Sequence, residues 1–349
     1  FTLWLDRMIW NINPLGYHLT NLLIHICCTI LVYFISGYFL KNKNFQFSAS
    51  LLFLVHPIHS LSLFWISGRT DMVCALFFLL SFLYFLKYFH EKQRRYYIFF
   101  TLFFIISLLA KEMSLSLPII IGSYIFIQAN DNFKRRIIQS FKSVIPLLAI
   151  IILYFGLRML FLPGQEVSNE VHVKTAISHL VKNFASFIGL LVIPTGHIQI
   201  AAFLKANPFV FTLLAAISLF LGLFIFWKYR KSGNVLFLLL FVVISILPVL
   251  RLVMRWYLYI PSIGFSILIA YLIFQQLDTT RVKRLLRIIF ISVILLTYTI
   301  IIFKEQKQWV YNGKIAKKIS EEINNILEKN DIDEVLFINN ISEISETPV

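Results

Sequence analysis

Long apolar runs follow one another along almost the whole of this 349-residue chain. A helix needs about 20 mostly apolar residues to cross the hydrocarbon of a bilayer. The runs are continuously apolar and do not alternate every second residue, which favours helices over membrane strands. We therefore predict about ten transmembrane helices, at about 20–40, 45–64, 72–89, 97–110, 114–129, 143–161, 208–227, 235–250, 260–276 and 286–303.

Composition supports the same fold class. Hydrophobic residues make up 59% of the chain, whereas soluble domains hold about 45–50%. The three cysteines, Cys27, Cys28 and Cys74, fall in apolar spans and form no disulfide or metal-binding pattern. We predict an all-α integral membrane protein, with a membrane domain over 1–303 and a small soluble tail over 304–349.

The basic residues orient the predicted helices. The net charge is +15. The loops around 41–43, 87–95, 134–142, 228–231 and 281–287 hold 17 lysines and arginines, against nine in the opposite set of connections. The positive-inside rule places the first set in the cytoplasm. The basic charge thus predicts contact with anionic membrane lipid rather than a nucleic-acid partner.

This orientation makes the connections 56–71, 110–113, 162–207 and 251–259 external, together with everything after 303. Residues 1–18 fit an interfacial helix that ends at Asn-Pro-Leu-Gly, and we expect a further span before Phe1. The weak apolar run within 177–194 is interpreted as re-entrant or interfacial. In the tail, 315–327 has the spacing of an amphipathic helix, and 334–340 resembles a short strand.

Polar residues gather at the predicted external side in four clusters. Ionisable groups in or near a bilayer are costly and usually face a cavity or each other. The clusters therefore predict a polar pocket at the outer membrane boundary. They consist of His18 with Asn21 and His25; His56, His59, Arg69 and Asp71; Lys111 and Glu112; and Arg251, Arg255, Tyr257 and Tyr259.

Each cluster also has a purely structural interpretation. His56 and His59 lack a third ligand at metal-site spacing, which favours a role in shaping the loop. Asp71 can cap a helix that begins at Met72. Lys111 and Glu112 can pair with each other across a turn. Arg255 can be part of an aromatic belt, as a snorkelling arginine.

Four segments resemble a known family: NPLGYHLTNLLIH (13–25), HPIHSLSLFWISGRTDMVCALFFLLSFLYF (56–85), LLAKEMSLSLP (108–118) and RWYLYIPSIGF (255–265). They are similar to the GT-C membrane glycosyltransferases related to protein O-mannosyltransferases, and most similar to the transmembrane and TPR-containing O-mannosyltransferases and their bacterial relatives. The resemblance covers about 1–130 and 250–265. It implies a GT-C-like bundle that transfers a sugar from a polyprenyl-phosphate carrier to an acceptor on the external or lumenal face.

By position, the resemblance places Arg69 and Asp71 beside the catalytic centre. It implies that Lys111, Arg251 and Arg255 contact the lipid phosphate or its sugar. Two features depart from the family. Leu61 stands where relatives often have an acid, and the main catalytic acid of the family belongs to a first external loop that precedes this chain, for which Asp6 is a poor substitute.

The residue types suit this chemistry. A carboxylate can take the proton of an acceptor hydroxyl that attacks the anomeric carbon, and cations can hold the leaving lipid phosphate. We expect a bacterial inner membrane or an endoplasmic reticulum location. Protein, lipid and glycan acceptors stay open, as does a divalent metal as cofactor.

Two other functions fit the sequence less well. A transporter or flippase of lipid-linked or anionic solutes usually shows internal repeats and helices broken at the midplane. In this chain the charges gather on one side and no repeat is visible. The other alternative is a non-catalytic scaffold whose tail binds a partner, which the absence of an acidic pair before Phe1 would favour.

Overall fold

The computed structural model describes residues 2–161, 177–194, 207–275, 280–330, 343–344 and 347–348. Its long helices form a bundle, and most predicted apolar runs lie in one helix each. The run at 45–64 is instead divided between Lys43–Leu54 and Pro57–Phe64, which meet at a bend of 41°, and the run at 114–129 begins in a 3₁₀ helix. The α-helices are α1 (Thr2–Trp10), α2 (Pro14–Ser36), α3 (Lys43–Leu54), α4 (Ser60–Phe64), α5 (Arg69–Glu91), α6 (Arg94–Ala110), α7 (Leu117–Gln128), α8 (Phe133–Phe161), α9 (Ile177–Val192), α11 (Pro208–Tyr229), α12 (Gly233–Ile246), α13 (Tyr259–Gln275) and α14 (Arg281–Asn330).

Short 3₁₀ helices join several of the long ones at a single end of the bundle. Such turns often connect or terminate α-helices. They are η1 (Pro57–His59), η2 (Ile66–Gly68), η3 (Glu112–Ser116), η4 (Leu247–Val249) and η5 (Arg255–Leu258). Two-residue strands β1 (Glu343–Ile344) and β2 (Thr347–Pro348) pair antiparallel near the C-terminus.

Local sequence explains the boundaries of the first helices. Asn13 caps α2 by accepting a hydrogen bond from the backbone N–H of Leu15, and Pro14 occupies the first helical position, where its missing N–H costs nothing. Asn42 caps α3 in the same way. The predicted break after the interfacial helix is therefore confirmed: α1 ends at Trp10 and α2 begins at Pro14.

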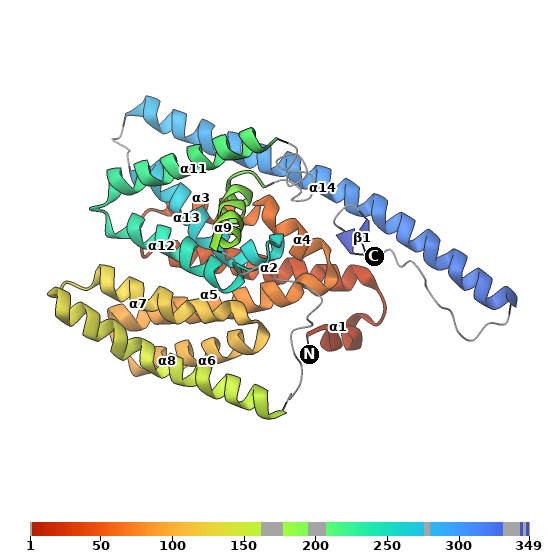
Figure 1. The fold of residues 1–349 in the computed structure, drawn as a ribbon, viewed down its shortest axis with the longest axis horizontal. Helices are drawn as coiled ribbons and strands as arrows, with labels where there is room; N and C mark the ends of the chain where they lie inside the picture. The colour runs from red at the N-terminus through yellow and green to blue at the C-terminus, as the bar shows by residue number, and fades with distance from the viewer. Residues whose placement is uncertain are drawn as a thin grey trace.

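The core of the bundle lies between α2, α3, α5, α7, α12 and α13. Helix α5 packs against α2 and α6, and α13 packs against α3 and α12. Aromatic rings fill the centre, where Phe82 and Phe237 stack at 6.0 Å between ring centroids and both are buried. In Figure 1 α6, α7 and α8 lie on one side of the bundle and α11 and α14 on the other.

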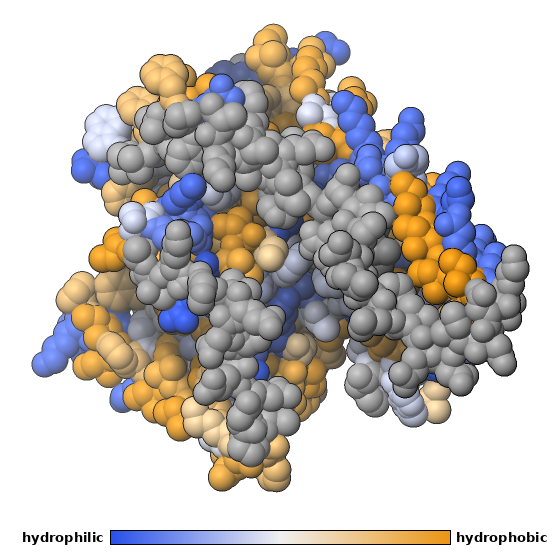
Figure 2. Space-filling view, turned by 45° about the vertical axis from the view of Figure 1, so that its right-hand side comes forward, coloured by the Kyte–Doolittle hydropathy of each residue, from blue (hydrophilic) through white to orange (hydrophobic). Residues whose placement is uncertain are grey.

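Large apolar side chains are exposed over the outside of the bundle, which is the surface that a bilayer would cover. Figure 2 shows them in broad patches. Five described helices are long and apolar enough to cross a membrane, or six if the bent pair Lys43–Leu54 and Pro57–Phe64 is counted as one span. The prediction of an integral, all-helical membrane protein agrees with these features.

Helices α9 and α14 bear on two predictions, the interpretation of 177–194 and the division between the last span and the tail. Helix α9 has 16 residues, and the helices α7 and α12, which lie in predicted spans, are shorter still. The re-entrant or interfacial interpretation of 177–194 therefore stays a prediction. Helix α14 runs without a break from Arg281 to Asn330, so the last predicted span and the predicted amphipathic helix of the tail are one helix. The predicted strand at 334–340 lies outside the described residues.

Candidate functional site

The first turn of α5 carries Arg69, one of the largest fully buried side chains of the described chain. Its guanidinium lies 2.5 Å from the carboxylate of Asp6 on α1, a residue that is itself only 3% exposed. It also donates to the backbone carbonyl of Tyr17 at 2.9 Å. A buried cation needs a counter-ion and hydrogen-bond acceptors to offset the loss of its hydration. Asp6 therefore lies inside the cluster, although its place in an interfacial helix made it a poor candidate.

Close packing between α1 and α2 brings Asp6 to this position. Gly16 lies directly under the ring of Trp10, and a Cβ atom at Gly16 would come within 2.2 Å of that ring. The hydroxyl of Thr20 donates to Asp6 at 3.0 Å. Thus the Asn-Pro-Leu-Gly segment, which breaks the helix, also lets α1 fold back onto α2.

Asn21 connects Arg69 to the loop that precedes it. Its side-chain oxygen accepts a hydrogen bond of 2.7 Å from Nε of Arg69. Its amide nitrogen donates to the carbonyls of Leu63 and Trp65, at 3.4 and 3.5 Å. Asn21 is fully buried. It therefore fixes the position of Arg69 relative to the α4–η2 segment.

Asp71 is two residues further along α5 and faces another partner. The ammonium of Lys111 lies 2.6 Å from its carboxylate, and the same ammonium lies 4.9 Å from the centre of the Tyr257 ring. Asp71 is buried, whereas the Lys111 side chain is 20% exposed. Three predicted external segments thus meet at one ion pair, which is accessible from the lysine side.

The helix boundary corrects one interpretation of Asp71. Helix α5 begins at Arg69, and its capping residue Gly68 makes no side-chain cap. Asp71 lies in the first turn of the helix and does not cap a helix at Met72, although a carboxylate there still benefits from the helix dipole. As expected for residues two apart on one helix, Arg69 and Asp71 point to different partners.

The structural pairing of Lys111 with Glu112 is wrong. Glu112 accepts a 2.7 Å hydrogen bond from Arg158 at the end of α8, and both side chains of this pair are about half exposed. This hydrogen bond keeps the pKa of the Glu112 carboxyl below its ordinary value. Adjacent residues diverge here because Lys111 is extended and η3 begins directly after it.

Arg255 at the start of η5 is buried and already has a counter-ion. Its guanidinium lies 2.8 Å from the carboxylate of Glu305 on α14 and donates to the carbonyl of Pro57 at 3.1 Å. The hydroxyl of Ser60 also hydrogen-bonds to Glu305. By contrast, the side chain of Arg251 is exposed and has no ion pair in the described part of the chain.

The histidines form a buried aromatic cluster with Tyr259. His56 accepts from the backbone N–H of Ile58 and contacts the carbonyl of Leu191, so it shapes the loop as predicted. His59 is hydrogen-bonded to Ser262 at 2.8 Å. His25 lies 2.6 Å from the hydroxyl of Tyr259. Among the described residues, no three His, Cys, Asp or Glu side chains are close enough together to hold a metal ion.

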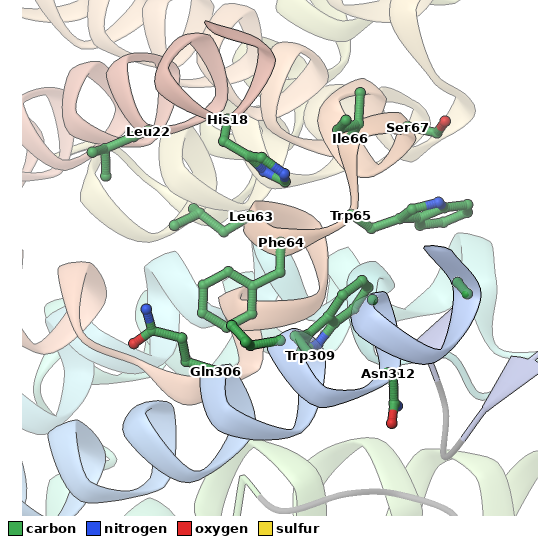
Figure 3. Close-up of a pocket in the computed structure, with 13 residues that line it drawn as sticks. His18, Leu22, Leu63, Phe64, Trp65, Ile66, Ser67, Gln306, Trp309 and Asn312 are labelled. Atoms are coloured by element: carbon green, nitrogen blue, oxygen red, sulfur yellow. The ribbon is translucent and has the colours of Figure 1, made fainter. Parts of the chain in front are cut away.

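His18 lies apart from these pairs, in the wall of a cavity of about 780 Å³ between α2, the α4–η2 segment and α14 (Figure 3). Contacts therefore connect members of all four predicted clusters, but His18 and Arg251 make none of the ion pairs described above. Sequence reasoning missed Glu305 because it lies in the tail, and it did not single out the link made by Asn21.

Comparison with known proteins gives one consistent group of relatives. Protein O-mannosyl-transferase F38B6.6 of Caenorhabditis elegans is 32% identical over 143 residues, which are 39% of this chain and 20% of that protein. Protein O-mannosyl-transferase TMTC3 of Homo sapiens is 26% identical over 354 residues, 87% of this chain and 38% of that protein. Protein O-mannosyl-transferase TMTC2 of Homo sapiens is 40% identical over 92 residues, 26% of this chain and 11% of that protein.

The chain thus spans well under half the length of these curated relatives. No protein-family model matches it, and no solved structure does. The agreement among the relatives nevertheless confirms the resemblance predicted from the four motif segments. The chain is similar in sequence to the protein O-mannosyl-transferases.

Proposed function

We propose that the protein is a multi-span GT-C-type glycosyltransferase. It moves a hexose, of the mannose class, from a polyprenyl-phosphate carrier to a hydroxyl group of a protein acceptor. The reaction takes place at the external or lumenal face of a bacterial inner membrane or of the endoplasmic reticulum. The names of the relatives support the sugar and the acceptor class.

The observation that carries the proposal is the partly buried ion pair between Asp71 and Lys111, whose ammonium lies over the ring of Tyr257. Asp71 and Lys111 come from two of the segments that carry the resemblance, and Tyr257 from a third. The carboxylate and the ammonium, 2.6 Å apart, neutralise each other. An incoming phosphate competes for Lys111, which leaves the Asp71 carboxylate free to accept a proton.

The transfer step then balances. The acceptor oxygen bonds to the anomeric carbon while the bond from that carbon to the phosphate oxygen breaks. We assign the hydroxyl proton to the Asp71 carboxylate, in place of the catalytic acid that the resemblance implies before Phe1. The lipid phosphate leaves with the bonding electron pair, and Lys111 stabilises the charge that develops on it.

The other arginines of the predicted site are not equivalent. Glu305 already neutralises Arg255, and Asp6 neutralises Arg69. Arg251 is exposed and has no carboxylate partner among the described residues. We therefore assign phosphate contact first to Lys111 and Arg251. Arg69 and Arg255 hold the surrounding loops in place.

Transfer of labelled mannose from mannosyl polyprenyl phosphate to a serine-containing peptide by the purified full-length protein tests the proposal. Asp71→Asn and Lys111→Gln should each lower the rate at least about 100-fold, which is the contribution typical of a positioned acid or base. Glu112→Gln is the matched control, because Glu112 is paired with Arg158 and not with Lys111, and both side chains of that pair are about half exposed. Full activity of both Asp71→Asn and Lys111→Gln would disprove the site assignment.

A further inference from the structure

A large cavity lies beside the proposed site and holds none of its ionisable residues. It has a volume of about 780 Å³ and opens between the N-terminal part of α2, the α4–η2 segment and the second half of α14. Figure 3 shows His18 and Leu22 on one side of it and Gln306 and Trp309 on the other. Ligand-binding cavities commonly measure about 300–1,000 Å³.

The residues that line the cavity carry no formal charge apart from the titratable ring of His18. Aromatic and aliphatic side chains make up most of the wall, and a few amides and hydroxyls are interspersed among them. A phosphate buried here would meet no cation, which disfavours the donor headgroup. The lining residues are His18, Leu22, Leu63, Phe64, Trp65, Ile66, Ser67, Gln306, Trp309, Val310, Asn312, Gly313 and Ala316.

The position of the cavity favours an occupant from the aqueous side. The wall contributed by α14 begins at Gln306, beyond the last predicted span, which ends at 303. A polyprenyl tail stays within the hydrocarbon, whereas a polypeptide approaches from water. Tryptophan rings and side-chain amides together suit a polypeptide, because they contact apolar side chains while they pair with backbone groups.

Two contacts link the wall of the cavity to the proposed site. Asn21 donates to the carbonyls of Leu63 and Trp65 in the cavity wall and accepts from Arg69 on the other side. The ring of Trp65 also packs on Trp256 at 5.6 Å, and Trp256 is followed directly by Tyr257. Through Trp256 and Tyr257 the wall of the cavity is thus connected to Lys111, whose ammonium lies over the Tyr257 ring.

We propose that this cavity binds the segment of the acceptor polypeptide next to the modified hydroxyl, through uncharged aliphatic or aromatic side chains. The inference rests on the proposed function, since it names the acceptor subsite of that reaction. It gives the enzyme a preference for acceptors whose flanking residues are apolar. Flanking glutamates disfavour binding, because a carboxylate would lose its hydration without gaining a cation.

Gly313 offers a way to fill the cavity without disturbing the fold. It lines the cavity, and a Cβ atom added to it would meet no atom within 4 Å. Gly313→Phe should raise the KM for a serine peptide with flanking leucines about tenfold, the loss expected when one apolar side chain is no longer buried. The KM for mannosyl polyprenyl phosphate and kcat should stay unchanged. Gly156→Phe is the matched control, because Gly156 is equally open but lies on α8.

Binding can be measured without sugar transfer. The photo-crosslinker p-benzoylphenylalanine in place of Val310, which lines the cavity, should capture the leucine-flanked peptide and much less of a glutamate-flanked one. The same crosslinker in place of Tyr311, an exposed residue of the same helix outside the cavity lining, should capture neither.

The outcomes separate the two proposals. Capture of the peptide from position 310 without any mannose transfer would disprove the proposed function and leave peptide binding by the cavity standing. Mannose transfer with an unchanged peptide KM in Gly313→Phe, and no capture from position 310, would overturn the cavity assignment alone. Capture of mannosyl polyprenyl phosphate instead of the peptide would overturn it as well.

Discussion

Helices α5 and α8 are both long and apolar enough to cross a membrane, but they relate to the rest of the protein in opposite ways. Of the most apolar 18-residue stretch of each, 56% is buried in α5 and 6% in α8. Each helix also carries an arginine at one end. Arg69 of α5 is buried against Asp6, whereas Arg158 of α8 meets Glu112 in the open.

The contrast shows where charge can be structural and where it is incidental. Water solvates exposed ions about as well as an ion partner does, so removing an exposed ion pair has little effect on the free energy of unfolding. A buried pair has lost its water, and each ion depends on the other. Lys111 and Glu112 are adjacent in the sequence, yet Lys111 pairs with the buried Asp71 of α5 and Glu112 pairs with the exposed Arg158 of α8.

The largest expected effect is at Arg69. Arg69→Met leaves the Asp6 carboxylate buried without a counter-ion, which should lower the free energy of unfolding by about 3–5 kcal/mol. The midpoint of thermal unfolding in detergent should fall steeply. Arg158→Met in α8 should leave that midpoint unchanged. The double variant Asp6→Asn with Arg69→Met should recover part of the loss, and no recovery would show that the ion pair is not its cause.

Removing Lys111 should have a smaller effect on stability, because its side chain is partly exposed. Lys111→Met should cost about 2 kcal/mol, the range for a hydrogen bond to a charged group. Combining it with Asp71→Asn should restore stability but not sugar transfer. A thermal midpoint of the double variant no higher than that of Lys111→Met would contradict the ion pair as the stabilising contact.

The helices and the meeting of the motif segments could be predicted from the sequence. Most predicted apolar runs lie in one helix each, because the length and continuity of such runs are local properties, whereas the bend within 45–64 was not predicted. The motif segments that carry Arg69, Asp71, Lys111 and Tyr257 do come together. The distribution of basic residues predicted that they lie on one side of the membrane, and the identity of that face stays a prediction.

The partners of these residues could not be predicted in the same way. Asp6 and Glu305 lie in segments that look interfacial or soluble, and only the packing of α1 and α14 brings them to Arg69 and Arg255. The pairing of Lys111 depends on the angle at which η3 leaves α6. Such contacts join residues far apart in the sequence, about which local pattern holds no information.

Glycines give a third way to compare the two helices. Gly68 caps α5 against the backbone of Ser62, where an added Cβ atom would lie 2.9 Å from the Ser62 Cα. Because backbone cannot move aside cheaply, Gly68→Ala should destabilise the protein by about 1–2 kcal/mol. Gly156→Ala on α8 meets no atom within 4 Å and should stabilise it slightly, because alanine favours helix. Equal thermal midpoints for the two variants would contradict the close packing before α5.

The smallest effect is expected at Glu112. Its pKa is lowered by the hydrogen bond from Arg158. Any stability from the pair is therefore present above the ordinary pKa of a glutamate and is lost as the pH falls through the lowered value. Because both side chains are about half exposed, Glu112→Gln should leave the thermal midpoint at neutral pH and the rate of sugar transfer unchanged. A large loss of activity in this variant would show that the exposed pair of Glu112 and Arg158 takes part in the site. The site would then not be confined to the ion pairs of α5.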